Sequence, residues 1–411
     1  MDSRVGAQRL GVGSSTRARI ALVVAGSLLF LLSCAVARGG FFSSADPGDV
    51  SRYREFAERM LDGLLPYRDF YMEYPPGAIL AFLLPKLGGA DYNLWFKLSV
   101  AVAGVLLVAA LVGALAALRA GRARTALTLG TLVIAPVALG AVVLNRYDLW
   151  PALLLVLALL ALLSERPRLG FGLLAAGCAV KIFPAVVLPV AAVHVLRTRG
   201  RTALLQSLAV FAAVLALLVL PFAALAPGGL GYSVYTQTIR QLHLESLAAS
   251  LLLAADNLGL YTSSIVPGKP GSIDLEGTLP DALGVLTTAL LLAALAATLL
   301  AYWRAGESRE LLVVGVAASV AAFVTFSKVV SPQFLVWLVP LVPLVAGRAG
   351  RVATALLVAA LVTTQVEVVY EHPLREVGWP VWVLLLRNGL LVALFVVLLV
   401  ELRRHAPRRG T

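Results

Sequence analysis

Long apolar runs constrain this chain more than any other feature. Of its 411 residues, 60% are hydrophobic and 14% are charged, whereas soluble domains carry about 25% charged residues. A helix needs about 20 apolar residues to cross a bilayer. Apolar runs of this kind occur at 20–37, 93–118, 124–144, 147–164, 203–226, 281–303, 310–327, 331–346, 351–369 and 380–402. The sequence therefore predicts an all-α polytopic membrane protein built as one domain, 1–411.

Basic residues in the short connections account for the net charge of +12. If the runs alternate in direction, all the arginine clusters fall on one face, which the positive-inside rule makes cytoplasmic. This pattern reports membrane orientation rather than nucleic-acid binding. It predicts a plasma-membrane protein with both termini in the cytoplasm. The clusters are Arg4, Arg9, Arg17 and Arg19; Arg119, Arg122 and Arg124; Arg166 and Arg168; Arg197, Arg199 and Arg201; Arg304 and Arg309; Arg348 and Arg351; and Arg403, Arg404, Arg408 and Arg409.

One further apolar run, 170–196, is ambiguous. A full crossing would place the arginines that follow it outside and would invert every later connection. A re-entrant pair of half-helices, broken near Pro184 or Pro189, keeps both ends on the cytoplasmic side. We favour the re-entrant hairpin, which gives ten spans plus a broken segment, about 10–11 membrane helices. A full crossing that violates the charge rule is the alternative.

The first large external loop, 38–92, is rich in acids and aromatic residues. Within it, 49–58 has helical spacing, so Asp49 and Tyr53 share one helix face, and 77–87 is expected to form a short interfacial helix. A carboxylate beside the membrane can act as a general base towards a hydroxyl group. The competing interpretation is that Asp49 caps its helix or is a solvated acid.

The second large external loop, 227–280, carries Arg240, His243 and Glu245 on an expected amphipathic helix. These side chains form either a solvated polar face or the wall of a substrate site. The glycine- and proline-containing stretch 268–281 is expected to be a flexible part of this loop.

Single charged residues near the outer ends of the spans are further candidates. In the N-R-Y-D turn, Arg146 is suited to an anion, and helix capping is the favoured role of Asp148. Lys328 and Arg387 either reach the lipid headgroups or bind an anionic lipid phosphate. Lys181 lies at the expected break of the re-entrant hairpin, where it either pairs with a carbonyl or stabilises the hairpin.

The sequence predicts neither a metal site nor a nucleotide site. Its four histidines lack metal-ligand spacing, its two cysteines lie in apolar runs, and no phosphate-binding glycine motif is visible. No cofactor is expected, and a divalent metal is the alternative left open.

Six segments spread over most of the chain carry a resemblance to a known family. They are D-V-S-R-Y (49–53), G-L-L-P-Y-R-D-F-Y-M-E-Y-P-P-G (63–77), N-R-Y-D (145–148), K-I-F-P (181–184), R-Q-L-H-L-E-S-L (240–247) and F-S-K-V-V-S-P-Q-F-L-V-W-L-V-P (326–340). In this order they resemble glycosyltransferase family 87, the polyprenol-phosphate-mannose-dependent mannosyltransferases of the membrane-embedded GT-C superfamily.

The resemblance implies a GT-C fold whose first external loop carries a catalytic aspartate. Asp49 matches that position, and Asp46 is its competitor. The aspartate would deprotonate an acceptor hydroxyl, which attacks the anomeric carbon with inversion while a polyprenyl phosphate leaves. The implied partners are a polyprenyl-phosphate-linked sugar, a glycolipid or cell-envelope glycan acceptor, and membrane lipids. Mannose is the favoured sugar, and a pentose such as arabinose is the close competitor.

The substrate-binding candidates combine the matched segments with the charges at the outer ends of the spans. They are Tyr53, Tyr67, Asp69, Glu73, Tyr74, Arg146, Asp148, Arg240, His243, Glu245, Lys328 and Gln333. A transporter or lipid flippase is the rival class, because buried cations and broken helices also suit transport. The lack of a visible repeat and the acidic first loop favour the enzyme.

Overall fold

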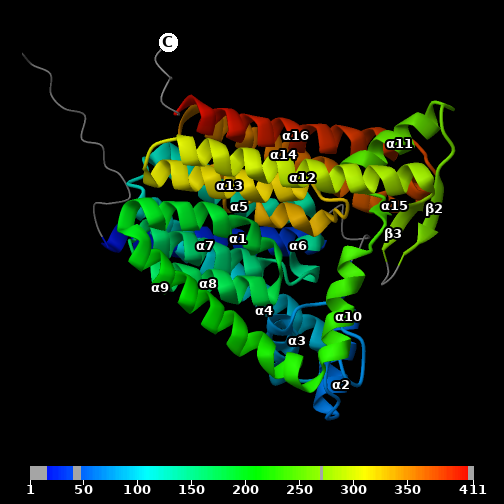
Figure 1. Cartoon of the computed structure of the whole chain (residues 1–411), viewed down its shortest axis with the longest axis horizontal. Coiled ribbons are helices and arrows are strands. Elements are labelled where there is room, and N and C mark those ends of the chain that lie inside the picture. The colour runs from blue at the N-terminus through cyan, green and yellow to red at the C-terminus, as the bar shows by residue number, and fades with distance from the viewer. Residues whose placement is uncertain (1–15, 40–47, 269–271, 406–411) are drawn as a thin grey trace, which may run out of the picture.

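The computed structural model describes residues 16–39, 48–268 and 272–405. Most of them are helical (Figure 1). The α-helices are α1 (Thr16–Gly39), α2 (Val50–Leu61), α3 (Ile79–Leu83), α4 (Tyr92–Ala117), α5 (Arg122–Leu139), α6 (Val142–Asn145), α7 (Leu149–Leu163), α8 (Pro167–Val180), α9 (Leu188–Leu225), α10 (Pro227–Thr238), α11 (Leu247–Asn257), α12 (Thr278–Arg304), α13 (Arg309–Phe326), α14 (Gly347–Val369), α15 (Glu371–Arg375) and α16 (Pro380–Arg404). The 3-10 segments are η1 (Pro76–Ala78), η2 (Leu84–Gly88), η3 (Phe183–Val187), η4 (Pro332–Trp337) and η5 (Val342–Leu344), and the strands are β1 (Leu242–His243), β2 (Ser264–Pro267) and β3 (Ile273–Glu276).

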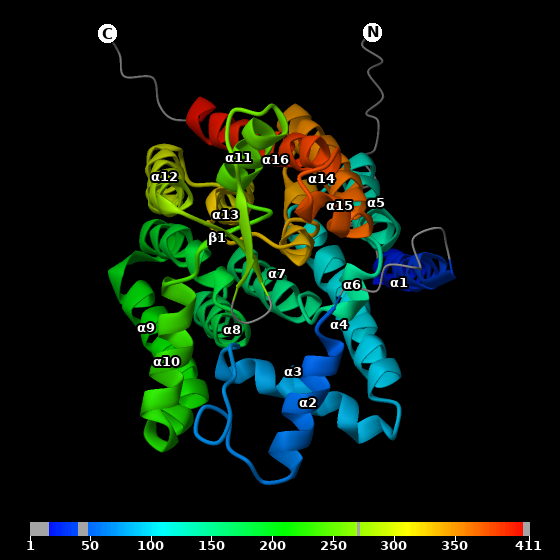
Figure 2. The same ribbon diagram turned by 90° about the vertical axis from the view of Figure 1, so that its right-hand side faces the viewer.

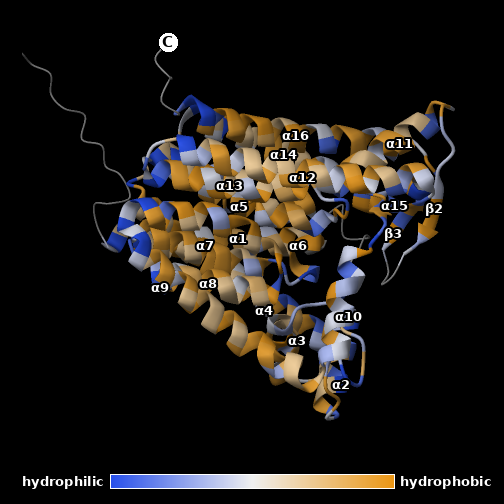
Figure 3. Cartoon of the chain, in the orientation of Figure 1, coloured by the Kyte–Doolittle hydropathy of each residue, from blue (hydrophilic) through white to orange (hydrophobic). Residues whose placement is uncertain are grey.

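Within the described residues, eight helices are long and apolar enough to cross a membrane. They are α1, α4, α5, α9, α12, α13, α14 and α16. Many of these helices run along the long axis of the molecule (Figure 1), and their apolar middle lies between more hydrophilic ends (Figure 3). The predicted all-α polytopic membrane fold is confirmed.

Two of the ten predicted runs form other elements. Run 147–164 yields α7, whose 15 residues extend only about 22 Å. Run 331–346 forms η4 and η5, because its prolines interrupt an α-helix. The segment from Lys328 to Leu344 still joins the two ends of the molecule, since Lys328 O accepts from His243 N at one end and Leu344 O accepts from Arg124 at the other. Leu335 to Val345 are buried, so protein rather than lipid surrounds this irregular backbone.

The ambiguous run 170–196 forms the predicted re-entrant hairpin. Helix α8 ends at Val180, Lys181 has an extended backbone, and α9 begins at Leu188 after η3. Beyond this break the chain returns to the end from which it came, because Arg199 pairs with Glu165 just before α8. The break begins at Lys181, before the expected prolines, which instead start η3 and α9 at positions where the missing N–H is not needed.

The arginine-rich connections meet at one end of the bundle, called here the basic end. There Arg124 binds Glu310 with nitrogen–oxygen distances of 2.8 and 2.7 Å, and Arg309 binds Glu165 at 2.9 Å. The opposite end, called the loop end, carries α2, α3, α10, α11 and the strands (Figures 1 and 2). The predicted sorting of the connections onto two ends is confirmed for the described residues. Arg4, Arg9, Arg408 and Arg409 lie outside them.

A small antiparallel sheet of order β1-β3-β2 corrects two expectations for the second loop. The expected amphipathic helix is wrong, because α10 ends at Thr238 and Leu242–His243 pairs with β3. Burial alternates here with a period of two rather than with the helical period. The expected flexible stretch 268–281 is also wrong over Ile273–Glu276, which forms the central strand.

Candidate functional site

Asp49 lies at the start of α2, but its side chain does not cap that helix. Its carboxylate instead forms an ion pair with Arg146 and accepts a hydrogen bond from the Tyr74 hydroxyl at 3.2 Å. The capping interpretation of Asp49 is therefore wrong. The side chain is 23% exposed, so Arg146 and Tyr74 hold the carboxylate while part of it remains accessible to solvent. Its competitor Asp46 lies outside the described residues.

Close backbone approach brings Asp49 to Arg146. A Cβ atom at Gly48 would lie 2.8 Å from Asn145 Cβ and 3.1 Å from Asn145 O. Only glycine allows the start of α2 to contact the N-R-Y-D turn this closely. The pair of charges thus depends on a small residue in the first loop and on the turn between α6 and α7.

An aromatic cluster supports this pair. Tyr53 stacks on Phe82, with ring centroids 4.6 Å apart, and meets Tyr74 and Tyr147 edge-on at 5.6 Å. Tyr53 is buried, so it contacts its neighbours rather than an open surface. Tyr74 belongs to the cluster and reaches Asp49 with its hydroxyl. The predicted pairing of Asp49 and Tyr53 on α2 thus places the acid beside packed aromatic rings.

Asp148 forms a second ion pair. Lys181 Nζ lies 2.6 Å from Asp148 Oδ1, and Trp337 Nε1 donates to the same oxygen at 2.7 Å. The predicted capping role of Asp148 is wrong, because its side chain makes no capping bond to α7. In the described part of the chain, Asp148 Oδ2 is buried without a hydrogen-bond partner.

Aromatic rings enclose the Lys181 amine. Its nitrogen lies 4.9, 5.2 and 5.6 Å from the ring centroids of Tyr147, Trp337 and Phe334, distances that allow cation–π attraction. The 14 residues of α8 rise about 21 Å, which is less than the roughly 30 Å hydrocarbon core. Lys181 therefore lies recessed within the protein. Sequence reasoning missed Trp337, although a lysine at the tip of an apolar hairpin signals a buried partner.

A third cluster surrounds Arg387 on α16. This residue is fully buried and lies 3.2 Å from Glu367 and 3.5 Å from Glu245. It also donates to Glu245 O at 3.0 Å. The headgroup interpretation of Arg387 is therefore wrong. Sequence reasoning missed Glu367, although a carboxylate inside an apolar span is itself a signal of a buried partner.

Glu245 connects the charged clusters. Burial raises the pKa of the Glu245 carboxyl to about 8, opposed by Arg387 and reinforced by Glu367. Burial lowers the pKa of Arg146, while the carboxylates of Asp148 and Glu245 raise it again. The charges of Glu245 and Arg146 thus act on each other's pKa. The structure gathers Asp49, Arg146, Asp148 and Glu245, all chosen from the sequence, at the loop end.

Three other candidates form ion pairs and hydrogen bonds within the first loop. Glu73 forms an ion pair with Arg52 at 3.0 Å, and the Tyr67 hydroxyl donates to Tyr74 O at 2.5 Å. Asp69 accepts from Leu65 N at 2.7 Å and pairs with Arg68. The hydrogen bonds from Arg68 and the Leu65 backbone lower the pKa of the Asp69 carboxyl to about 2. These contacts hold the loop that presents Tyr74 to Asp49.

Two of the remaining candidates, Lys328 and His243, link the second loop to the segment before η4. Lys328 Nζ donates to Thr238 O at 2.8 Å, and His243 N donates to Lys328 O at 3.0 Å. Burial lowers the pKa of His243 to about 3, with help from the positive charge of Arg240. Gln333 is buried and accepts from the Ser331 hydroxyl at 2.6 Å.

This arrangement supplies an anchored carboxylate, a guanidinium beside it and a recessed amine. Such groups can accept a proton from a hydroxyl and stabilise a phosphate anion. Within the described residues, no group of three or more histidine, cysteine, aspartate or glutamate side chains could hold a metal ion.

Comparisons with known proteins give one family match and one similar solved structure. Residues 71–332 match the model of glycosyltransferase family 87, a span that covers more than half of the chain and includes Arg146, Asp148 and Glu245 but begins after Asp49. The chain is similar to the crystal structure of ArnT from Cupriavidus metallidurans bound to undecaprenyl phosphate, with a TM-score of 0.49 and 16% sequence identity, over 95% of this chain and 78% of that one. No curated protein matches the chain.

Proposed function

As a member of glycosyltransferase family 87, the chain is a membrane glycosyltransferase, and we propose that it transfers mannose from a polyprenyl-phosphate donor. The acceptor in this proposal is a hydroxyl group of a glycolipid or cell-envelope glycan at the extracytoplasmic face. The rival transporter interpretation rests on buried cations, which here have partners of their own in Asp148 and Glu367.

The contacts of Asp49 carry the proposal. Because its carboxylate is held by Arg146 and Tyr74 instead of its own helix, it is oriented and still partly exposed. A general base needs both properties, since it must reach the hydroxyl proton in a defined geometry.

The reaction then follows from the placement of charge. The acceptor oxygen attacks the anomeric carbon from the face opposite the phosphate, and its proton passes to Asp49. The bond between the anomeric carbon and the phosphate oxygen breaks, so configuration inverts. The polyprenyl phosphate leaves as an anion. In this proposal Arg146, which lies beside Asp49, stabilises the leaving anion.

The test is sugar transfer in membranes that contain the protein, with polyprenyl-phosphate-mannose as donor and a lipid-glycan pool as acceptor. Asp49→Asn keeps the shape of the side chain but cannot accept the proton, so transfer should fall by about 10²- to 10⁴-fold. Asp62→Asn is the matched control, because Asp62 is exposed in the same loop and its change should leave transfer intact.

Three outcomes would change the proposal. Full transfer by Asp49→Asn would move the base to Asp148 or Asp46. Transfer by the wild type only from a polyprenyl-phosphate pentose would replace mannose as the sugar. No transfer from either donor would contradict the proposed donor class.

A further inference from the structure

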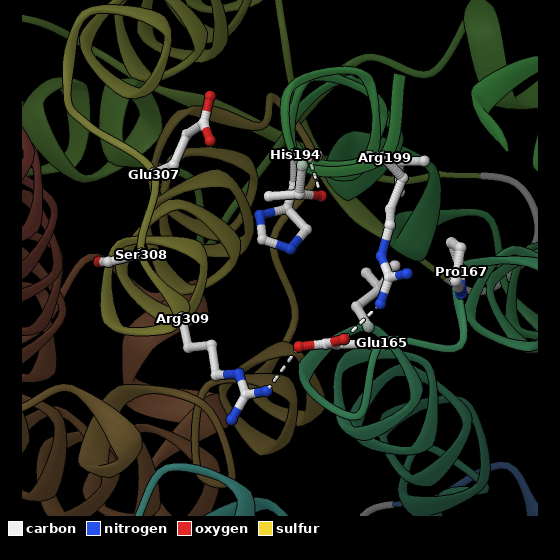
Figure 4. Close-up of a pocket in the computed structure, with 10 residues that line it drawn as sticks. Glu165, Pro167, His194, Arg199, Glu307, Ser308 and Arg309 are labelled. Atoms are coloured by element: carbon white, nitrogen blue, oxygen red, sulfur yellow. Dashed lines mark hydrogen bonds and ion pairs between the residues drawn. The ribbon is translucent and has the colours of Figure 1, made fainter. Parts of the chain in front are cut away.

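A cavity of about 320 Å³ opens at the basic end, opposite the site around Asp49. It lies between the turn that joins α7 to α8, the returning part of α9 and the start of α13 (Figure 4). Its polar lining includes Glu165, His194, Thr198, Arg199, Ser308 and Arg309. Neither the family match nor the proposed transfer reaction assigns a role to this cavity.

Two guanidinium groups converge on one carboxylate in this cavity. Arg199 pairs with one oxygen of Glu165, and Arg309 lies 2.9 Å from the other. All three side chains are roughly half-exposed, at 43%, 45% and 57% for Arg199, Arg309 and Glu165. Exposed ion pairs contribute little net free energy, because water and salt screen the charges. An external anion can therefore displace the Glu165 carboxylate at low cost.

His194 adds a buried polar group to the same space. It is 8% exposed, and its Nδ1 lies 3.1 Å from the Tyr302 hydroxyl. Its ring points into the space between Arg199, Glu165 and Arg309, whereas the carboxylate of Glu307 points away from it (Figure 4).

The amino-terminal end of α13 contributes an electrostatic field that favours anion binding. Ser308 Oγ accepts from Leu311 N at 3.0 Å, so the helix begins in the wall of the cavity. The amino-terminal end of an 18-residue helix carries a partial positive charge that favours anions.

We propose that this cavity binds a phosphate group, with Arg199 and Arg309 as its ligands in place of Glu165. Guanidinium groups recognise carboxylate and phosphate with the same two-pronged geometry, so Glu165 occupies the anion position when no ligand is bound. The phosphate comes either from the headgroup of an anionic phospholipid or from the free ion. The proposal does not depend on the transferred sugar or on the role of Asp49.

Two variants that break the same ion pair separate binding from folding. Arg309→Gln removes a phosphate ligand and should weaken binding about tenfold. Glu165→Gln removes the competing carboxylate and should strengthen binding by a similar factor. If Glu165 and Arg309 were only structural, both variants would lower stability and neither would bind more tightly. Arg351→Gln, at the exposed start of α14 and outside the cavity, is the control for total charge.

The measurement is native mass spectrometry of the purified full chain in detergent, together with thermal unfolding. The probes are dioctanoyl-phosphatidylglycerol, dioctanoylglycerol without phosphate, and inorganic phosphate. Binding of phosphatidylglycerol alone would identify a lipid headgroup, and an equal effect of inorganic phosphate would identify the free ion. Binding that is absent from all probes, or that changes in the same direction in Arg309→Gln and Glu165→Gln, would overturn the proposal.

Discussion

At the scale of single residues, the loop end holds charges that water hardly reaches. Lys181 and Asp148 are 16% and 2% exposed, and Arg387 and Glu367 are 0% and 2% exposed. A buried ion is tolerated only while its partner remains. These residues thus make the stability of the protein depend on pairs rather than on single side chains.

Removing one member of the buried Lys181–Asp148 pair should therefore lower the free energy of unfolding. Lys181→Met leaves Asp148 without its charged partner, and the expected loss is about 3–5 kcal/mol of unfolding free energy, measured by thermal unfolding in detergent. The double variant with Asp148→Asn should recover part of the loss. Arg59→Gln, which breaks the exposed pair with Glu55, should cost less than about 1 kcal/mol. An equal loss in Lys181→Met and Arg59→Gln would contradict the argument.

Glu245 should give the protein a pH-dependent stability. Burial raises the pKa of its carboxyl from the ordinary 4.5 to about 8 in the folded protein. Between these values the folded state holds a proton that the unfolded chain has released, so the unfolding free energy falls as pH rises through this window. Glu245→Gln resembles the protonated acid and should flatten this slope in thermal unfolding measured across the window.

The surrounding charges define the control for this prediction. Arg387, Glu367, Glu371 and Arg146 all act on Glu245, and all remain in the Glu245→Gln variant. Glu55→Gln changes an exposed glutamate and should leave the slope as it is in the wild type. A slope that persists in Glu245→Gln would assign the titration to another group.

Local sequence identified these residues better than it identified their contacts. Asp49 and Arg146 were chosen from motifs, and the structure brings them together. Capping was the favoured role for Asp148 because spacing along the chain reveals only local partners. Its actual partners, Lys181 and Trp337, come from the hairpin and from η4, and no local pattern encodes such distant contacts.

At the scale of elements, the P-P-G segment fixes the first loop on the tip of the hairpin. A Cβ atom at Gly77 would lie 2.6 Å from Ala179 O and 2.9 Å from Val180 N. Both atoms belong to the backbone of α8, which cannot rotate away. The segment η1 and the end of α8 can pack this closely only with glycine at this position.

Gly77→Val should therefore separate the first loop from the hairpin. We expect a loss of about 1–3 kcal/mol from overpacking, together with loss of transfer, since this loop positions Tyr74 beside Asp49. Gly231→Ala is the matched control, because a Cβ atom there meets no atom within 4 Å and alanine favours the helix. Thermal unfolding and the transfer assay test both variants. Normal transfer by Gly77→Val would show that the close contact is not required.

The elements differ in how far the sequence predicted them. The hairpin at 170–196 followed from charge, since only a return to the same end keeps the arginines together. The strands at Leu242–His243 and Ile273–Glu276 did not, because a two- or four-residue strand is too short to show a period. Pairing with a distant segment creates these strands.

At the scale of the whole molecule, the two ends differ in charge, and the positive-inside rule predicts that the basic end faces the cytoplasm. Asp62→Cys places a thiol at the loop end, and Gly306→Cys places one at the basic end, both at exposed positions. A membrane-impermeant maleimide should label the first variant in intact cells and the second only after permeabilisation. The reverse pattern would invert the topology.

The wild type provides the background for this experiment. Its two cysteines, Cys34 and Cys178, are buried, so the unmodified protein should remain unlabelled in the folded state. Labelling of the wild type would show that one of these thiols is accessible and would require its replacement before the topology is read.

The buried stretch from Leu335 to Val345 has a consequence for biogenesis. This stretch crosses between the two ends without a continuous α-helix, and lipid cannot satisfy the hydrogen-bonding groups of such a backbone. It contacts α14, a helix that the ribosome makes afterwards. The insertion machinery therefore cannot release this stretch into the bilayer as it emerges. We expect it to stay against the earlier helices α5, α7 and α13, which it also contacts, until α14 covers it, so the last spans complete a crossing that precedes them in the chain.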